Sequence, residues 1–317
     1  MSVEKTMDVS ATIDALTKIN TEDFLEALGL EKVRVGRGVL ELLCRRAARR
    51  FAEEVFAYDA AVGRTCLCEG AAALLWQNVG SLHVSGVENV PLEGPLLVAS
   101  NHPGLTDSIA LFASLPRKDL FIVAADRPFL RAIGETSKHI IYLKHRSDFQ
   151  ITALREIVRR LNEGRAVLIF PGGQIEPDPS ISNEASRALE DWSKSIGLIV
   201  RLAKNVRVVT AIVSGVSSPL AQKHPLTKLR RERRDREKVG AVLQIMWERY
   251  RSVEVKIAYG EPLARAELLE HGGEPEAVTR RIIESARHLV ERPPTVWQPV
   301  ASGICGDAGV TRTAGTL

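Results

Sequence analysis

The sequence predicts an α/β fold: a mixed sheet of about 6–8 strands flanked by helices, preceded by an N-terminal helical extension. Two observations predict it. From residue 96 onward, short apolar segments alternate with longer segments whose apolar residues recur at helical spacing. The segment at 166–170 is wholly apolar, as strands are when helices cover both faces of a sheet. A chain of 317 residues is long enough for one such domain and an extension.

An N-terminal helical region is predicted for residues 1–80. Residues 1–37 indicate short, loosely packed helices without a recognisable motif, and a further helix is predicted at 65–76. Between them, apolar residues that include Leu40 and Phe51 predict a helix over 39–58, with arginines at 45, 46, 49 and 50 mostly on its other faces. Such a basic amphipathic helix either lies on an anionic membrane surface or packs against the domain with its arginines solvated.

The main domain is predicted at residues 81–292, where strands and helices alternate without an internal repeat. A polar, Gly-rich stretch completes the chain, so residues 293–317 are predicted to be a disordered tail. The predicted strands lie at 96–99, 120–124, 140–143, 166–170, 206–213 and 253–259, and the predicted helices at 109–115, 151–161, 186–203, 226–250 and 274–291.

Composition excludes several classes of protein. No apolar run approaches the roughly 18 to 20 residues that span a bilayer, so any membrane contact is expected to be peripheral. The charged N-terminus lacks the apolar core of a secretory signal, and we expect a cytoplasmic protein. The four cysteines, at 44, 66, 68 and 305, do not have the spacing of a zinc site and are interpreted as buried or idle thiols. A net charge of +4 gives no indication of nucleic-acid binding.

One stretch carries an indication of chemistry. Residues 99–108 read Ala-Ser-Asn-His-Pro-Gly-Leu-Thr-Asp-Ser and connect an apolar strand to a predicted helix. A carboxylate at Asp107 could accept a hydrogen bond from one ring nitrogen of His102, fix its tautomer and stabilise the imidazolium, leaving the other nitrogen free to take a proton. The alternative is structural, with His102 capping a turn and Asp107 capping the helix.

Four stretches in this order and spacing resemble the signatures of the glycerolipid acyltransferases, the family of lysophosphatidate and glycerol-3-phosphate acyltransferases. Residues 101–107 resemble the Asn-His-x-x-x-x-Asp signature that carries catalysis. Tyr-Leu-Lys-His-Arg at 142–146 resembles the second, whose basic residue binds phosphate, and Phe-Pro-Gly-Gly at 170–173 resembles the third, Phe-Pro-Glu-Gly. Residues 208–212 resemble the weaker, mainly hydrophobic fourth. The resemblance covers residues 82–262 and implies catalytic roles for His102 and Asp107.

The third signature departs from the family pattern. Gly172 stands where the family has glutamate, and Gln174 and Ile175 stand where a threonine and a phosphate-binding arginine usually follow. Glu176 is a candidate replacement for the missing carboxylate, although residues 176–179 could equally form a rigid surface loop. The amides of Gly172 and Gly173 are candidate oxyanion donors, and the alternative is that both glycines only make a tight turn.

The resemblance implies a phosphate site built on Arg146 and Lys144. Arg127 is a candidate helper there, and the alternative is a solvated arginine in a linker. The basic run at 228–234 could add to a membrane surface, but its interleaved acids favour a solvent-exposed helix.

The implied reaction is transfer of a fatty acyl group from acyl-CoA or acyl carrier protein to a hydroxyl of a lysophospholipid or glycerol phosphate, with His102 as general base and Asp107 as its partner. This implies a role in phospholipid biosynthesis, no metal or bound cofactor, and peripheral association with the inner face of an anionic membrane. Two alternatives remain. One is a hydrolase, or an acyltransferase for a non-phosphate acceptor, on the same fold. The other is a membrane- or partner-binding protein that has lost activity.

Overall fold

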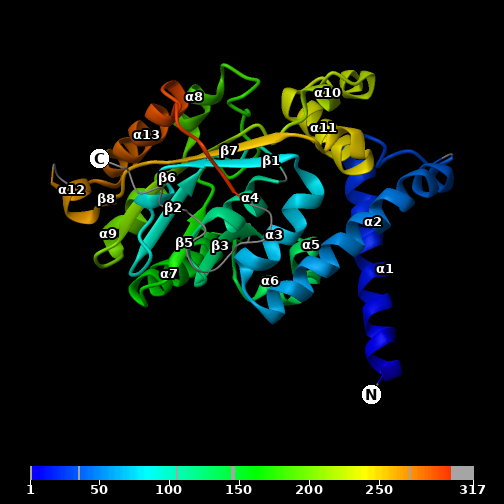
Figure 1. The fold of residues 1–317 in the computed structure, drawn as a ribbon, viewed down its shortest axis with the longest axis horizontal. Coiled ribbons are helices and arrows are strands. Elements are labelled where there is room, and N and C mark those ends of the chain that lie inside the picture. Colours follow the sequence, from blue (N-terminus) through cyan, green and yellow to red (C-terminus); the bar gives the residue numbers. More distant parts are fainter. Residues whose placement is uncertain (1, 35, 105, 144–146, 271–272, 301–317) are drawn as a thin grey trace, which may run out of the picture.

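A mixed β-sheet forms the centre of the molecule (Figure 1). The structure is a computed structural model that describes residues 2–34, 36–104, 106–143, 147–270 and 273–300. The predicted fold class is confirmed, with nine strands within these residues. They are β1 (Ser81–Ser85), β2 (Leu96–Ser100), β3 (Leu120–Ala125), β4 (Ile140–Leu143), β5 (Ala166–Ile169), β6 (Arg207–Ser214), β7 (Glu254–Tyr259), β8 (Leu263–Ala264) and β9 (Gln298–Pro299).

The strand order places β2 between two parallel neighbours. Along the sheet the order is β4-β3-β5-β2-β6-β7-β1-β9, and β8 pairs with β6. Strands β4, β3, β5, β2 and β6 are all parallel, whereas β7 is antiparallel to β6 and parallel to β1. The carboxyl ends of the five parallel strands therefore share one edge of the sheet, which is where open α/β sheets bind ligands.

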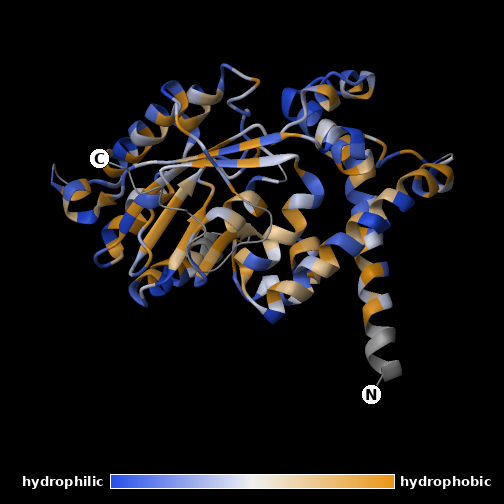
Figure 2. Cartoon of the chain, viewed as in Figure 1, coloured by the Kyte–Doolittle hydropathy of each residue, from blue (hydrophilic) through white to orange (hydrophobic). Residues whose placement is uncertain are grey.

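Helices cover both faces of the sheet, which explains why the central strands are apolar on both sides (Figure 2). One face packs against α3 (Leu67–Asn78) and α4 (Asp107–Ser114). The other packs mainly against α7 (Ser147–Asn162), α9 (Ser195–Leu202) and α13 (Pro275–Glu291). All five residues of β2 are buried between these two cores.

The N-terminal region differs from the short, loose helices expected for residues 1–37. A helix of 26 residues, α1 (Ser2–Ala27), packs along α2 (Arg37–Arg64). Leu16 of α1 is fully buried against residues of α2, including Val55. The two helices lie at one end of the molecule and reach beyond the sheet (Figure 1).

Two long helices expected from periodicity are broken in the structure. The segment at 186–203 contains α8 (Ala185–Ala188), a 3₁₀ turn (Leu189–Asp191) and then α9, because Trp192 adopts an extended conformation. The segment at 226–250 contains a 3₁₀ helix (Pro225–Leu229), α11 (Arg233–Met246) and a second 3₁₀ turn (Glu248–Tyr250). The shorter helices are α5 (Pro128–Ala132), α6 (Gly134–Ser137), α10 (Pro219–Gln222) and α12 (Arg265–Leu269).

The prediction of a disordered tail is corrected for the first residues of that segment. Strand β9 pairs antiparallel with β1, and Val300 N donates to Leu82 O at 2.9 Å, so backbone hydrogen bonds attach this segment to the sheet edge. Residues 301–317 lie outside the described residues. Helix α3 contributes fully buried residues, Ala71 and Leu75, to the core of the sheet. The division of the chain near residues 80 and 292 remains a prediction.

Candidate active site

Three loops meet at the carboxyl edge of the sheet. The loop after β2 carries His102, the loop after β5 carries residues 170–176, and the loop after β6 carries residues 215–218. Because β5 and β6 are the two parallel neighbours of β2, the sheet brings these loops together although they are distant in sequence. Hydrogen bonds connect the loop after β2 to the loop after β5, to strand β6 and to the loop after β6.

His102 and Asp107 form a hydrogen-bonded pair. Nδ1 of His102 lies 2.7 Å from Oδ2 of Asp107, the first residue of α4, whose side chain is 0% exposed. Gly104 N also donates to Oδ2, at 2.9 Å, and Ser108 Oγ donates to Oδ1 at 3.1 Å. Since the carboxylate accepts from Nδ1, the neutral ring carries its proton there, and Nε2 keeps the lone pair. The structure brings together the pair that the spacing singles out.

The ring of His102 lies in an acidic environment. Its side chain is 29% exposed and stacks on Phe170, with ring centroids 4.6 Å apart. Burial alone lowers the pKa of His102, but the charge of Asp107, its hydrogen bond and the charge of Glu176 raise it, and the net pKa lies above the ordinary value of histidine. These surroundings stabilise an imidazolium formed by proton uptake.

Asn101 fixes the start of this turn. Its Nδ2 donates to Val213 O at 2.9 Å, and its Oδ1 accepts from Val213 N at 2.8 Å. The two bonds attach the end of β2 to β6, and Asn101 is buried. The backbone that carries His102 is therefore held on the β6 side by a side chain.

A buried carboxylate holds the same backbone on the β5 side. Glu176 is 5% exposed, and its Oε2 accepts from His102 N at 2.8 Å. Glu176 N donates to His102 O, also at 2.8 Å, and Oε1 accepts from Trp192 Nε1 at 2.8 Å. Burial raises the pKa of Glu176 to about 7, although the bonds from Trp192 and His102 and the charge of His102 oppose this shift. A nearby carboxylate is thus present at this edge, from a residue four positions beyond Gly172.

The segment at 176–179 is not a surface loop, which corrects one of the two interpretations open from the sequence. Glu176, Pro177 and Asp178 are all buried. Asp178 Oδ1 accepts from Gly215 N at 2.9 Å, and its Oδ2 accepts from Ser217 N at 3.0 Å. The segment therefore ties the loop after β5 to the loops after β2 and β6, because buried carboxylates require such donors.

With this geometry in place, a comparison with protein families finds that residues 81–214 match the family model described as Acyltransferase. The matched part of the chain includes both His102 and Asp107. The family predicted from the sequence is confirmed. The 1-acyl-sn-glycerophosphate (LPA) acyltransferase PlsC from Thermotoga maritima is a similar solved structure, with 16% sequence identity and a TM-score of 0.43, over 89% of this chain and 98% of that one. A comparison with curated proteins finds no match.

The structure describes only one of the three cations predicted for a phosphate site. Strand β4 ends at Leu143 at the same edge as β2, but Lys144 and Arg146 lie outside the described residues. Arg127 is exposed at the N-cap of α5, and its charge acts on Asp23 of α1. A role of these three cations in binding phosphate remains a prediction.

Another cation, Arg234, was not singled out from the sequence. Its Nη1 donates to Gln174 Oε1 at 2.5 Å, so the start of α11 lies against the turn at 172–176. Arg234 belongs to the basic run at 228–234, for which a long exposed helix was expected. The sequence offered no signal for this contact, because it joins residues 60 positions apart.

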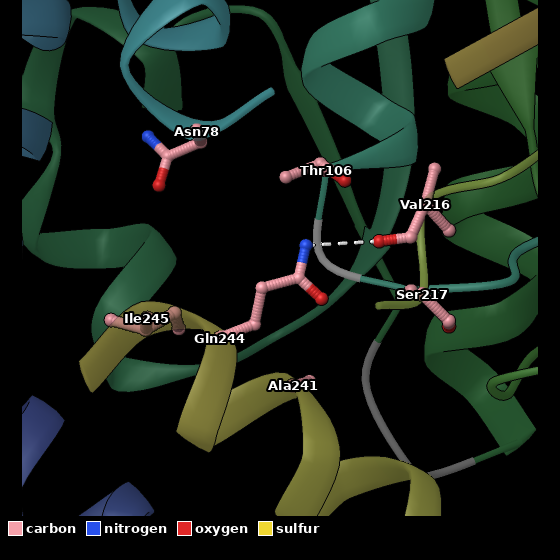
Figure 3. A pocket seen from close by; sticks show the side chains of 8 residues that line it. Asn78, Thr106, Val216, Ser217, Ala241, Gln244 and Ile245 are labelled. Atoms are coloured by element: carbon pink, nitrogen blue, oxygen red, sulfur yellow. Dashed lines mark hydrogen bonds between the residues drawn. The ribbon is translucent and has the colours of Figure 1, made fainter. Parts of the chain in front are cut away.

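A small pocket lies beside the turn from His102 to Asp107 (Figure 3). Gly104 and Thr106 line it from the loop after β2, and Val216 lines it from the loop after β6. Gln244 of α11 points into the same space, and its Nε2 donates to Val216 O at 3.1 Å. Helix α11 therefore holds the loop after β6 beside this pocket.

Proposed function

We propose that this acyltransferase moves a fatty acyl group from acyl-CoA or acyl carrier protein to a hydroxyl of a lysophospholipid or glycerol phosphate. The observation that carries the proposal is the contact of 2.7 Å between His102 Nδ1 and Asp107 Oδ2, at the edge of the sheet where substrates bind. A base held in this tautomer presents Nε2, the nitrogen that can take a proton from an acceptor hydroxyl.

The reaction then follows from the arrangement of the pair. Nε2 of His102 takes the hydroxyl proton as the acceptor oxygen attacks the thioester carbonyl carbon. Asp107 stabilises the imidazolium, as the carboxylate does in a serine-protease triad. When the tetrahedral intermediate collapses, the carbon–sulfur bond breaks, and the departing thiolate takes the proton from the imidazolium. The products are the acylated acceptor and the free thiol, and His102 is again neutral.

The turn after β5 is the proposed oxyanion site. Gly173 has a φ of 66°, a conformation that favours glycine, and its N–H donates to Phe170 O at 3.0 Å. That amide is engaged within the turn, so we assign the amide of Gly172 as the candidate donor to the oxyanion.

The acceptor's phosphate is proposed to lie over the same edge. Arg146 and Lys144 directly follow β4, whose carboxyl end shares this edge, and Arg234 brings a further cation to the turn at 172–176. Arginine and lysine are the usual protein partners of phosphate groups.

Membrane docking is proposed to use the start of α2, although not through Leu40 and Phe51. Leu40 and Phe51 pack against other parts of the protein, whereas Val39, Leu42 and Leu43 are 63%, 70% and 67% exposed. Figure 2 shows the apolar colour on the outer helices at this end of the molecule. An apolar patch exposed in this way on a basic helix suits an anionic lipid surface.

The arginines of α2 divide into two groups. Arg45 and Arg46 are exposed beside the apolar patch. Arg49 pairs with Asp14 and Glu53, and Arg50 donates to the carbonyl of Ile245, so these two hold helices together. We therefore assign only Arg45 and Arg46 to the proposed contact with anionic lipid, at the inner face of the membrane. Within the residues that the structure covers, no helix is long and apolar enough to cross a membrane.

A second candidate function is acyl transfer to an acceptor without phosphate. It is favoured by Gly172 and Ile175, which stand where the family that this chain resembles has a glutamate and a phosphate-binding arginine. Neither residue carries a charge with which to bind a polar head group.

The test uses the purified full-length chain, labelled acyl-CoA and a matched set of acceptors. Lysophosphatidate and the monoacylglycerol with the same acyl chain differ only by the phosphate, and glycerol-3-phosphate lacks the first acyl chain. We expect lysophosphatidate or glycerol-3-phosphate to be acylated at least about tenfold faster than the monoacylglycerol, as one charge-assisted contact to phosphate requires. Faster acylation of the monoacylglycerol would establish the second candidate. Release of free fatty acid without acceptor would indicate a hydrolase, and no turnover with any donor or acceptor would indicate a binding protein.

A further inference from the structure

Gly172 lacks a side chain, and Glu176 occupies the volume that a side chain would need. A Cβ on Gly172 would lie 2.9 Å from Glu176 Cδ, closer than real Cβ atoms approach their neighbours, and 3.0 Å from its Oε1. Gly173 has a positive φ, but Gly172 does not, so the backbone at 172 would accept any L-residue. A side chain at 172 would therefore require Glu176 to shift, whereas the conformation of the turn does not require glycine there.

The carboxylate that fills this space is bound on both oxygens. One oxygen accepts from the backbone of His102 and the other from the indole of Trp192, while the main chain of Glu176 donates back to His102 O. These contacts join the backbone of His102 to the loop after β5 by two hydrogen bonds, one to the side chain of Glu176 and one to its main chain. A shift of the Glu176 side chain would break one of them directly.

We propose that Glu176 is a positioning residue for acyl transfer, which enters the volume left free by Gly172, fixes the backbone of His102 and places a second carboxylate near the imidazole. The assignment rests on the proposed function, because it gives Glu176 a role only through His102 as the base. It also explains the departure from the third signature, since the carboxylate comes from position 176 instead of 172.

A second carboxylate near the ring affects its titration. The charged groups that act on the two residues are Glu176 on His102, His102 on Glu176, and Asp107 on both. Ionised Glu176 raises the pKa of His102, and Glu176 itself takes up a proton below about pH 7. The two groups are therefore expected to titrate as a coupled pair. As the pH falls, His102 gains a proton and can no longer act as a base, so the pair sets the acid limb of the activity profile.

The first test is the pH profile of Glu176→Gln. We expect kcat/KM to fall between about tenfold and 100-fold, because the amide can accept from only one of the two donors and the backbone of His102 moves. The acid limb should shift to lower pH and fit a single ionisation, because the negative charge that raises the pKa of His102 is gone. An acid limb with the wild-type midpoint and steepness would overturn the proposal.

Asp178→Asn is the matched control. Asp178 is a second buried carboxylate of the same loop that binds backbone amides, but its contacts are to Ser180, Gly215 and Ser217 and not to His102. This variant should lower Tm and leave the midpoint of the acid limb unchanged. A shift equal to that of the Gln variant would assign the effect to loop stability and refute a positioning role for Glu176.

A second set of variants keeps the proposal testable if Glu176→Gln fails to fold. Gly172→Ala should displace the carboxylate and reduce kcat/KM at least about tenfold. Gly134→Ala, where a Cβ meets nothing within 4 Å, should retain wild-type activity. Gly172→Glu should be impaired alone and recover at least about tenfold when combined with Glu176→Ala, which vacates the space. Full activity of Gly172→Ala or Gly172→Glu would refute the proposal. These tests are separate from the proposed function, which the acceptor assay with the wild-type chain tests.

Discussion

Replacement of Asp107 by asparagine tests the pairing with His102. The buried carboxylate accepts from His102 Nδ1 and Gly104 N on one oxygen, and from Ser108 on the other. An amide has one oxygen and one NH₂ group, so either orientation sets its NH₂ against groups that donated before. If the NH₂ faces His102, it donates to Nδ1 and moves the ring proton to Nε2. The nitrogen that should take the hydroxyl proton is then occupied.

The size of the effect follows from the contact distance. With 2.7 Å between Nδ1 and Oδ2, the centres of the two charges are about 4 Å apart, and at an effective dielectric constant of about 20 their attraction is about 4 kcal/mol. That attraction exists only when His102 is protonated, as it is in the transition state. Since about 1.4 kcal/mol corresponds to a factor of ten, Asp107→Asn should reduce kcat about 10³-fold.

The assay measures thiol release from acyl-CoA in the presence of the best acceptor, from pH 5 to 9. Loss of the carboxylate lowers the pKa of His102, so the ring of the variant is neutral in the alkaline part of this range, but in the wrong tautomer. Raising the pH should therefore not restore the rate. Asp59→Asn is the control, because Asp59 accepts from the amides of Glu135 and Thr136 far from His102. Both variants should lower Tm, and only Asp107→Asn should lose transfer. Recovery at pH 9, or a rate within tenfold of wild type, would refute the reasoning.

Three further predictions follow from the site and from α2. Arg146→Ala should raise KM for a phosphate-bearing acceptor much more than KM for the acyl donor, and equal changes in steady-state kinetics would remove Arg146 from the phosphate site. The free energy of unfolding should fall by up to about 3 kcal/mol from pH 4.5 to 7, since folded Glu176 keeps its proton over a range in which the unfolded side chain has lost it, and Glu176→Gln should flatten this dependence in urea titrations. Leu42→Glu with Leu43→Glu should weaken flotation with anionic vesicles at least about tenfold, whereas Leu92→Glu, at a side chain 69% exposed elsewhere, should not; equal flotation of both would contradict the docking surface.

The part of the site that is local in sequence could be predicted. His102 and Asp107 are separated by one turn between a strand and a helix, so their spacing alone allows the contact that the structure shows. The same holds for strands such as Ile140–Leu143, whose bounds match the apolar run. In both cases the residues that determine the local structure lie within a few positions of each other in the sequence.

The part that depends on strand order could not be predicted. Glu176 and Trp192 reach His102 only because β5 is the parallel neighbour of β2, and periodicity does not reveal this order. Gly172 had two sequence interpretations, a tight turn or an oxyanion donor. Neither interpretation explained the absence of a side chain at 172 by the space that Glu176 occupies, as the structure does.

The predicted helix lengths are wrong where a tertiary contact interrupts a periodic pattern. The apolar spacing over 186–203 is helical throughout, but Trp192 leaves the helix and donates its indole N–H to Glu176. The arginines of α2 show the same limit. Sequence alone groups Arg50 with its neighbours, either solvated or on a membrane surface, although it binds the carbonyl of Ile245 on α11.

The most direct test of the central claim is the acyl-transfer rate of His102→Ala. The ring packs on Phe170 at the edge of the site and is partly exposed, so the variant should fold with a Tm close to that of wild type. His83→Ala, which removes a partly exposed imidazole from β1, is the control and should keep its activity. Loss of general-base catalysis predicts a fall of about 10²- to 10⁴-fold in kcat for His102→Ala. Transfer near the wild-type rate by a folded His102→Ala protein would contradict the account.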